Sequence, residues 1–71
     1  MPKLPALTSK NVLTILQENG FEIDHTTGSH HIMYHSISKK RVTLPYHSKD
    51  LPKGTLLSII RMSGIARESF K

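Results

Sequence analysis

Hydrophobic residues in the first third of the chain repeat with a helical period. Four of them fall on one face at helical spacing: Val12, Leu13, Ile15 and Leu16. Thr8 or Ser9 suits the N-cap position, and Gly20 suits the position just after the last turn. We therefore predict a helix over residues 9–19.

Directly after the predicted helix, apolar and polar residues alternate one by one instead of repeating with the helical period. Phe21 and Ile23 alternate with two acidic residues, which predicts a short strand with one buried face. Residues 26–28, Thr-Thr-Gly, are typical of a turn and are expected to end that strand.

A second strand is predicted over residues 30–35. Ile32 and Tyr34 are expected on its core-side face, because alternate residues of a strand point the same way. By this parity His30 shares the core-side face and lies at the rim between sheet and helix. The opposite face then carries three side chains: His31, Met33 and His35.

The remaining pattern predicts a third strand and a second helix. Residues 38–40 form a polar hairpin tip, and residues 41–44 alternate until Pro45 limits the strand. Apolar residues then recur at helical spacing up to Gly64: Leu56, Leu57, Ile59 and Ile60. Residues 65–70 either pack Ile65 and Phe70 over the core or fray.

These elements predict an α+β fold in one domain, residues 1–71. The order helix, strand, strand, strand, helix suits a three-stranded antiparallel meander with both helices on one face of the sheet. A chain of 71 residues has room for one thin core, so burying an apolar surface against a partner would add to its stability. We expect a monomer or a small oligomer when the protein is free.

The composition narrows the class of protein further. The chain has no cysteine, which removes disulfides and thiolate metal sites and suits a reducing cytoplasm. It has neither a signal-peptide h-region nor an apolar run of the roughly 20 residues that cross a bilayer. We therefore expect a soluble, cytoplasmic protein that does not bind membranes.

Positive charge is concentrated in the middle of the chain. The formal net charge is +5 with histidines neutral. Residues 25–53 hold five basic residues against Asp50 alone: Lys39, Lys40, Arg41, Lys49 and Lys53. A basic stretch of this kind favours nucleic acid, because neutralised phosphates release counterions. A merely solvated surface is the alternative.

Five histidines raise the question of a metal site, but their spacing argues against one. His30 and His31 point to opposite faces of a strand, and His25 and His47 are expected in different loops. No cysteine and no helical His-x-x-x-His pair accompanies them. We expect neither a bound metal nor a cofactor.

His30 is the best-placed candidate for chemistry. Histidine titrates near neutrality and serves as the proton carrier in metal-free RNA cleavage, where the 2′-hydroxyl attacks the adjacent phosphorus. Gly28 would let a phosphate approach closely, and the Ser29 hydroxyl would hydrogen-bond its oxygens. From the local sequence alone, a structural role for His30 at the rim and for Gly28 in a tight turn is the simpler interpretation.

Several short motifs, in order, resemble the HicA toxins, RNA-cleaving partners of HicB antitoxins with a fold like a double-stranded-RNA-binding domain. The motifs span nearly the whole chain: Gly20-Phe21, Gly28-Ser29-His30-His31, Val42-Thr43-Leu44-Pro45 with His47, Leu51-Pro52-Lys53-Gly54-Thr55-Leu56, Ile59-Ile60 and Gly64-Ile65. Each motif alone is weak, whereas their order and spacing are specific.

The resemblance implies a metal-independent endoribonuclease that cleaves messenger RNA and inhibits translation. It implies that His30 is the essential acid/base residue, with His31 as runner-up, and that Gly28 and Ser29 accompany it. A second acid/base group is also needed, for which His31, His47 and Lys49 are candidates. The expected substrate-binding residues are Gly28, Ser29, Lys39, Lys40, Arg41, Lys49 and Lys53.

The expected partners are messenger RNA and a HicB-like antitoxin that covers His30 and the basic stretch. Two other functions stay open at this point. The chain is a non-catalytic RNA-binding module if the fold alone recognises duplex RNA through basic loops. Alternatively, it is mainly a protein-interaction partner whose nuclease activity has decayed.

Overall fold

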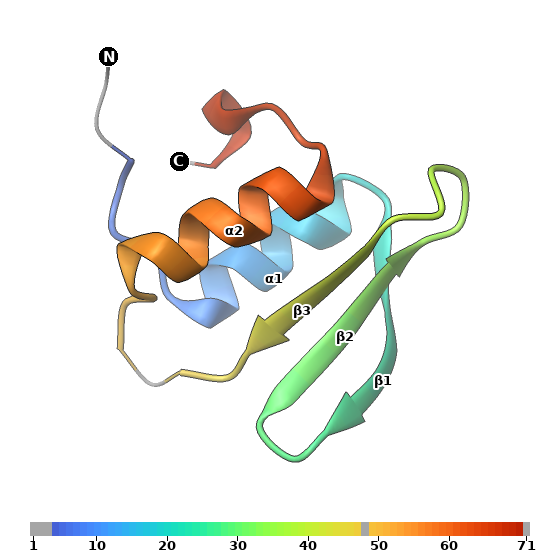
Figure 1. Cartoon of the computed structure of the whole chain (residues 1–71), viewed down its shortest axis with the longest axis horizontal. Helices are drawn as coiled ribbons and strands as arrows, with labels where there is room; N and C mark the ends of the chain where they lie inside the picture. Colours follow the sequence, from blue (N-terminus) through green and yellow to red (C-terminus); the bar gives the residue numbers. More distant parts are fainter. Residues whose placement is uncertain (1–3, 48, 71) are drawn as a thin grey trace.

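The computed structural model describes residues 4–47 and 49–70. These residues form two helices, three strands and a short 3₁₀ turn in the predicted order: α1 (Ser9–Glu18), β1 (Phe21–Thr27), β2 (His30–His35), β3 (Arg41–Pro45), α2 (Lys53–Ser63) and η1 (Arg67–Ser69). Both helices lie on the same side of the sheet (Figure 1). This is the helix, three-stranded antiparallel sheet and helix predicted from the sequence, and its topology is that of a double-stranded-RNA-binding domain.

Helix α1 begins at a capping box formed by Thr8 and Asn11. The Thr8 hydroxyl accepts a hydrogen bond from the backbone amide of Asn11 at 3.1 Å. The backbone amide of Thr8 donates in turn to Asn11 Oδ1 at 3.1 Å. These two bonds satisfy backbone donors that the first turn leaves free. Of the two predicted N-caps, the structure therefore uses Thr8, and Ser9 becomes the first helical residue.

The sheet is the predicted meander, with strand order β1-β2-β3 and antiparallel pairing throughout. Strand β1 is longer than predicted, because His25, Thr26 and Thr27 pair with β2 and leave only Gly28 and Ser29 for the turn. His25 therefore lies in a strand and not in the predicted loop. Gly28 has a φ of 48°, a conformation that glycine adopts without steric cost. The register shifts between Ile23 and His25, which is a β-bulge in an edge strand.

The predicted parity of β2 is wrong. Met33, not Ile32 or Tyr34, is the fully buried residue of this strand, at 0% exposure. Met33 pairs with Val42 of β3, which is equally buried, so the two side chains share the helix-facing side of the sheet. The alternation of β2 itself is ambiguous, and its register with β3 decides which face is covered.

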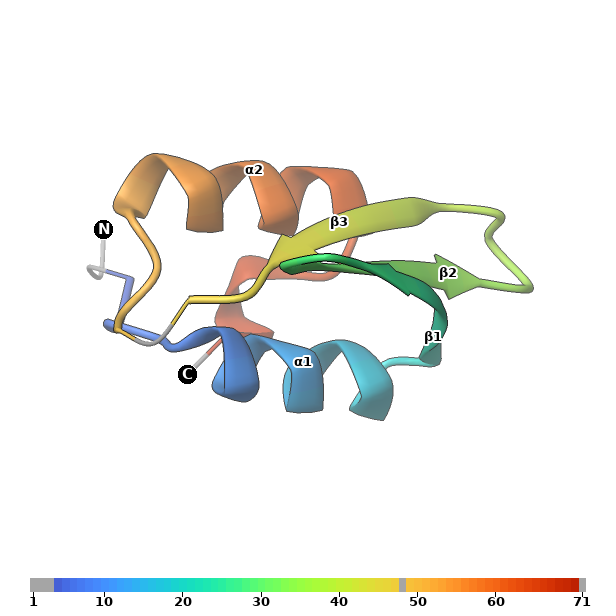
Figure 2. The ribbon, with the colours of Figure 1, turned by 90° about the horizontal axis from the view of Figure 1, so that it is seen from below.

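Helix α2 and the C-terminal segment close the core. The helix ends at Gly64, whose φ of 70° forms a left-handed cap. The segment then folds back over the two helices (Figures 1 and 2), and Phe70 is buried to 2% exposure. Of the two outcomes expected for residues 65–70, the structure adopts packing: Ile65 also lies against the core.

The core is one cluster between the helices and one face of the sheet. Its members are apolar side chains from every layer: Leu7, Val12, Ile15, Leu16, Phe21, Met33, Val42, Leu44, Leu51, Leu56, Ile59 and Phe70. No helix of the described residues lies over the opposite face of the sheet. Within the described residues, no helix is long and apolar enough to cross a membrane.

Candidate functional site

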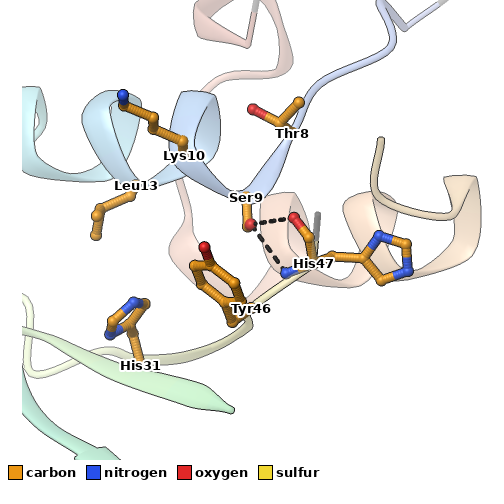
Figure 3. A pocket seen from close by; sticks show the side chains of 7 residues that line it. All are labelled: Thr8, Ser9, Lys10, Leu13, His31, Tyr46 and His47. Atoms are coloured by element: carbon orange, nitrogen blue, oxygen red, sulfur yellow. Dashed lines mark hydrogen bonds between the residues drawn. The ribbon is translucent and has the colours of Figure 1, made fainter. Parts of the chain in front are cut away.

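A pocket of about 390 Å³ opens where the start of α1 faces the start of β2 and the segment that follows β3. Its size is within the range of small-ligand sites. Seven residues line it: Thr8, Ser9, Lys10, Leu13, His31, Tyr46 and His47 (Figure 3). These residues come from three separate segments of the chain, so no local sequence pattern brings them together.

Ser9 fixes the wall of this pocket. Its hydroxyl donates to the His47 carbonyl at 2.9 Å and accepts from the His47 amide at 3.0 Å. The side chain is 4% exposed, so both bonds are shielded from water. Because one hydroxyl satisfies both backbone groups of His47, the segment after β3 is tied to the first turn of α1 (Figure 3).

His31 and Tyr46 face each other across the pocket. Their ring centroids lie 6.5 Å apart with the planes at 77°, an edge-to-face arrangement. The Thr26 hydroxyl lies 3.2 Å from His31 Nδ1 and orients the imidazole. Tyr46 is 67% exposed, yet its backbone is held because its amide donates to the Ser29 carbonyl. The pair thus presents two oriented rings to solvent.

The imidazole of His47 points away from His31, although His47 lines the pocket (Figure 3). Its Nδ1 lies 3.1 Å from the Lys49 carbonyl oxygen and 3.3 Å from the Lys49 amide nitrogen. The ring is therefore engaged with the backbone that follows it. Of the predicted candidates for a second acid/base group, His31 is the one whose ring faces the pocket.

His30 occupies the opposite face of β2 from His31. It pairs with Thr27 of β1 and Pro45 of β3, and its side chain is exposed. The predicted core-side, partly desolvated rim position is therefore wrong, for the same reason that the parity of β2 is wrong. The Ser29 hydroxyl lies 3.5 Å from His30 Nδ1. Gly28 and Ser29 form the turn that leads into it.

The basic residues predicted as one stretch separate into two groups in space. Lys39, Lys40 and Arg41 lie at the β2–β3 hairpin, whereas Lys49 and Lys53 lie at the opposite end of β3, at the start of α2 (Figure 1). The extended strand β3 separates the two groups, so basic residues that are close in the sequence do not form one surface patch.

Arg41 is partly engaged within the protein. Its guanidinium lies 3.3 Å from an Asp24 carboxylate oxygen and 4.6 Å from the centre of the Tyr34 ring. Asp24 also lies 2.8 Å from His25 Nδ1. The hydrogen bond to His25, followed by the one to Arg41, lowers the pKa of Asp24 from its usual value of 3.8.

Lys10, Ser9 and Tyr46 are functional candidates that were not predicted from the sequence. Lys10 belongs to a part of the chain with little net charge, and Ser9 was considered only as a helix cap. Tyr46 carried a usable signal: it is an aromatic residue in a polar segment, directly after the residue that limits a strand. Among residues 4–47 and 49–70, no group of three or more His, Asp or Glu side chains is arranged to hold a metal ion.

The fold and pocket define a small basic domain of double-stranded-RNA-binding topology. Two consecutive histidines, His30 and His31, begin its central strand. The model of one protein family, the HicA toxins of bacterial toxin-antitoxin systems, matches residues 9–65. This match covers most of the chain, including both helices, the whole sheet and every pocket-lining residue except Thr8. The chain belongs to the HicA toxin family. A search among curated proteins finds no match.

Proposed function

We propose that this chain is a metal-independent endoribonuclease that cleaves messenger RNA, with His30 as an acid/base residue. Members of the HicA family are generally messenger-RNA-cleaving toxins. The observation that carries the proposal for this chain is the exposed imidazole of His30 at the Gly28-Ser29 turn, 3.5 Å from the Ser29 hydroxyl. An exposed imidazole beside a hydroxyl is accessible to a phosphodiester and has a partner that orients it.

The proposed reaction is a transesterification within the RNA chain. A base takes the proton of the 2′-hydroxyl as its oxygen attacks the adjacent phosphorus, and an acid gives a proton to the departing 5′-oxygen. The products are a 2′,3′-cyclic phosphate end and a 5′-hydroxyl end. His30 fills one of these roles at a time, so a second group completes the reaction.

Basic side chains near the proposed site would hold the RNA backbone. Lys49, Lys53 and Lys10 lie toward the end of the sheet at which β2 begins, whereas Lys39 and Lys40 lie at the other end. We propose that the first three hold phosphates next to the cleaved bond. Lys39, Lys40 and Arg41 would contact the RNA farther from the cleaved bond.

Cleavage in EDTA tests this proposal directly. The wild type should cut a messenger RNA and leave cyclic phosphate ends, and it should leave a 2′-O-methylated RNA uncut. The His30→Ala variant should lose at least about a hundredfold in rate, the usual contribution of general acid or base catalysis. Its matched control is His25→Ala, another exposed strand histidine. Equal cleavage by His30→Ala would refute the role of His30, and intact RNA with the wild type would refute the activity.

The alternative is a non-catalytic RNA-binding module, favoured by the double-stranded-RNA-binding topology alone. Binding that weakens steeply with salt, without any cleavage, would support it. If the wild-type protein binds no RNA at all, both RNA cleavage and RNA recognition are excluded.

Membership of a toxin-antitoxin family implies an antitoxin partner. We propose that this partner resembles HicB and covers His30 together with the neighbouring lysines. Adding the product of an adjacent antitoxin-like gene should abolish cleavage. It should also shield the His30 ring from chemical modification by diethyl pyrocarbonate.

A further inference from the structure

We infer that the pocket between α1 and β2 is a nucleotide subsite, which holds one unstacked RNA base against Tyr46 beside His31. The inference rests on the proposed action on RNA and adds where the substrate is held and by which residues.

The first support is an exposed aromatic side chain on a fixed backbone. Tyr46 is 67% exposed, which leaves the hydrophobic ring of a large side chain in contact with water. Its own amide is bonded to Ser29, and the next residue is held through both backbone groups by the buried Ser9 hydroxyl. A ring presented in this way loses little conformational freedom when a base stacks on it.

The second support is the geometry around that ring. His31 meets Tyr46 edge to face, and Leu13 supplies an apolar wall from α1 (Figure 3). Single-stranded RNA is recognised by this combination, in which bases are stacked on aromatic rings and bounded by side chains that contact their edges. The volume of about 390 Å³ is sufficient for a small ligand.

The third support is charge. Three of the lining residues are basic, namely Lys10, His31 and His47, and the lining contains no Asp or Glu. With a net charge of +5 for the whole chain, these groups favour a ligand that carries phosphate. Lys10, at the rim on α1, is the group we assign to the phosphate next to the bound base.

The subsite is connected to His30 through a single residue. Pro45 pairs with His30 across β2 and β3 and directly precedes Tyr46. A base seated on Tyr46 would therefore lie beside the C-terminal end of β3, around which the RNA backbone would reach His30. This arrangement explains how a pocket on one face of the sheet serves a reacting group on the other.

Binding of a 2′-O-methyl RNA decamer, which cannot undergo 2′-hydroxyl attack, tests the subsite separately from cleavage. We expect Tyr46→Ala to raise the Kd at least about fivefold, the lower limit for loss of one stacked base. Tyr46→Phe, which keeps the ring, should recover most of that loss. Ile37→Ala removes an 86% exposed apolar residue at the β2–β3 hairpin and serves as the matched control, with a Kd within twofold of wild type.

Salt dependence and kinetics complete the test. Lys10→Gln should reduce the slope of log affinity against log salt by about 0.7, as expected for one phosphate contact on a single strand. With cleavable RNA, Tyr46→Ala should raise KM more than it lowers kcat. Circular dichroism before each measurement establishes that the variants are folded.

The outcomes separate the two proposals. If Tyr46→Ala binds and cleaves RNA like the wild type, the subsite is wrong and the proposed cleavage stands. If the wild type binds the decamer through Tyr46 but cuts no RNA, the subsite stands and the cleavage is wrong. If Tyr46→Ala keeps its affinity for RNA but loses affinity for the antitoxin, the pocket receives a protein side chain and the inference is overturned.

Discussion

His30 and His31 are consecutive in the chain, yet they lie on opposite faces of β2. His30 pairs with Pro45 on the face that no helix covers, whereas His31 pairs with Leu44 on the helix-facing side and lines the pocket. The two imidazoles therefore meet different surroundings, and each is accessible from a different side. This separation gives them distinguishable roles.

Substitution of each histidine should consequently have a different kinetic effect. We expect His30→Ala to lower kcat with little change in KM, because the group acts on the reacting bond. His31→Ala should mainly raise KM, because the side chain bounds the proposed subsite. Steady-state cleavage of a short fluorescent RNA measures both. The opposite pattern would make His31 the acid/base residue.

The parity of β2 can be tested by stability. Met33→Ala should lower the free energy of unfolding by about 2–5 kcal/mol, because it leaves a cavity in the core. Ile32→Ala should cost clearly less, because Ile32 is on the opposite face and only half-buried. Urea unfolding of both variants decides the question. A larger loss for Ile32→Ala would mean that the strand faces the other way.

The capping box of α1 should contribute measurably to stability. Thr8→Ala removes the acceptor for the Asn11 amide and should lower the free energy of unfolding by about 1 kcal/mol. Thr14→Ala, an exposed change inside the same helix, should be neutral or slightly stabilising, because alanine has the higher helix propensity. Thermal or urea unfolding compares the two. Equal effects would argue against Thr8 as the cap.

The lowered pKa of Asp24 makes a specific prediction about acid. Because the folded-state pKa lies below the usual value of 3.8, the ionised carboxylate stabilises the fold above about pH 4. That contribution is lost as the pH falls through the folded-state pKa. The effect should be small, because Asp24 and its two partners, His25 and Arg41, are all exposed.

Nuclear magnetic resonance titration of the Asp24 carboxyl checks this directly. His25→Gln should raise its pKa toward 3.8, and Arg41→Gln should raise it as well, because both hydrogen bonds stabilise the charged form. Asp24→Asn should lose the corresponding dependence of unfolding on pH below about 4. An Asp24 pKa at or above 3.8 in the wild type would contradict the assignment.

Much of the architecture followed from the sequence alone. The helical spacing of Val12 and Leu16, the alternation of Val42 and Leu44, and the glycine at position 64 each indicated one local structure, and the structure has all three. Local patterns suffice where one face is clearly apolar and the other clearly polar, because burial then has only one solution. The series of motifs similarly sufficed to indicate the family that the family model shows.

The sequence could not determine the faces of β2 or the composition of the pocket. Both parities of this strand offer apolar residues, Ile32 and Tyr34 on one side and Met33 on the other, so the choice depended on pairing with Val42. The pocket joins Ser9 to His47, 38 positions away, through hydrogen bonds that no local pattern encodes. The sequence by itself determined the elements, their order and the family. Only tertiary packing decided which histidine faces the pocket, because that follows from the register between strands and not from the strand itself.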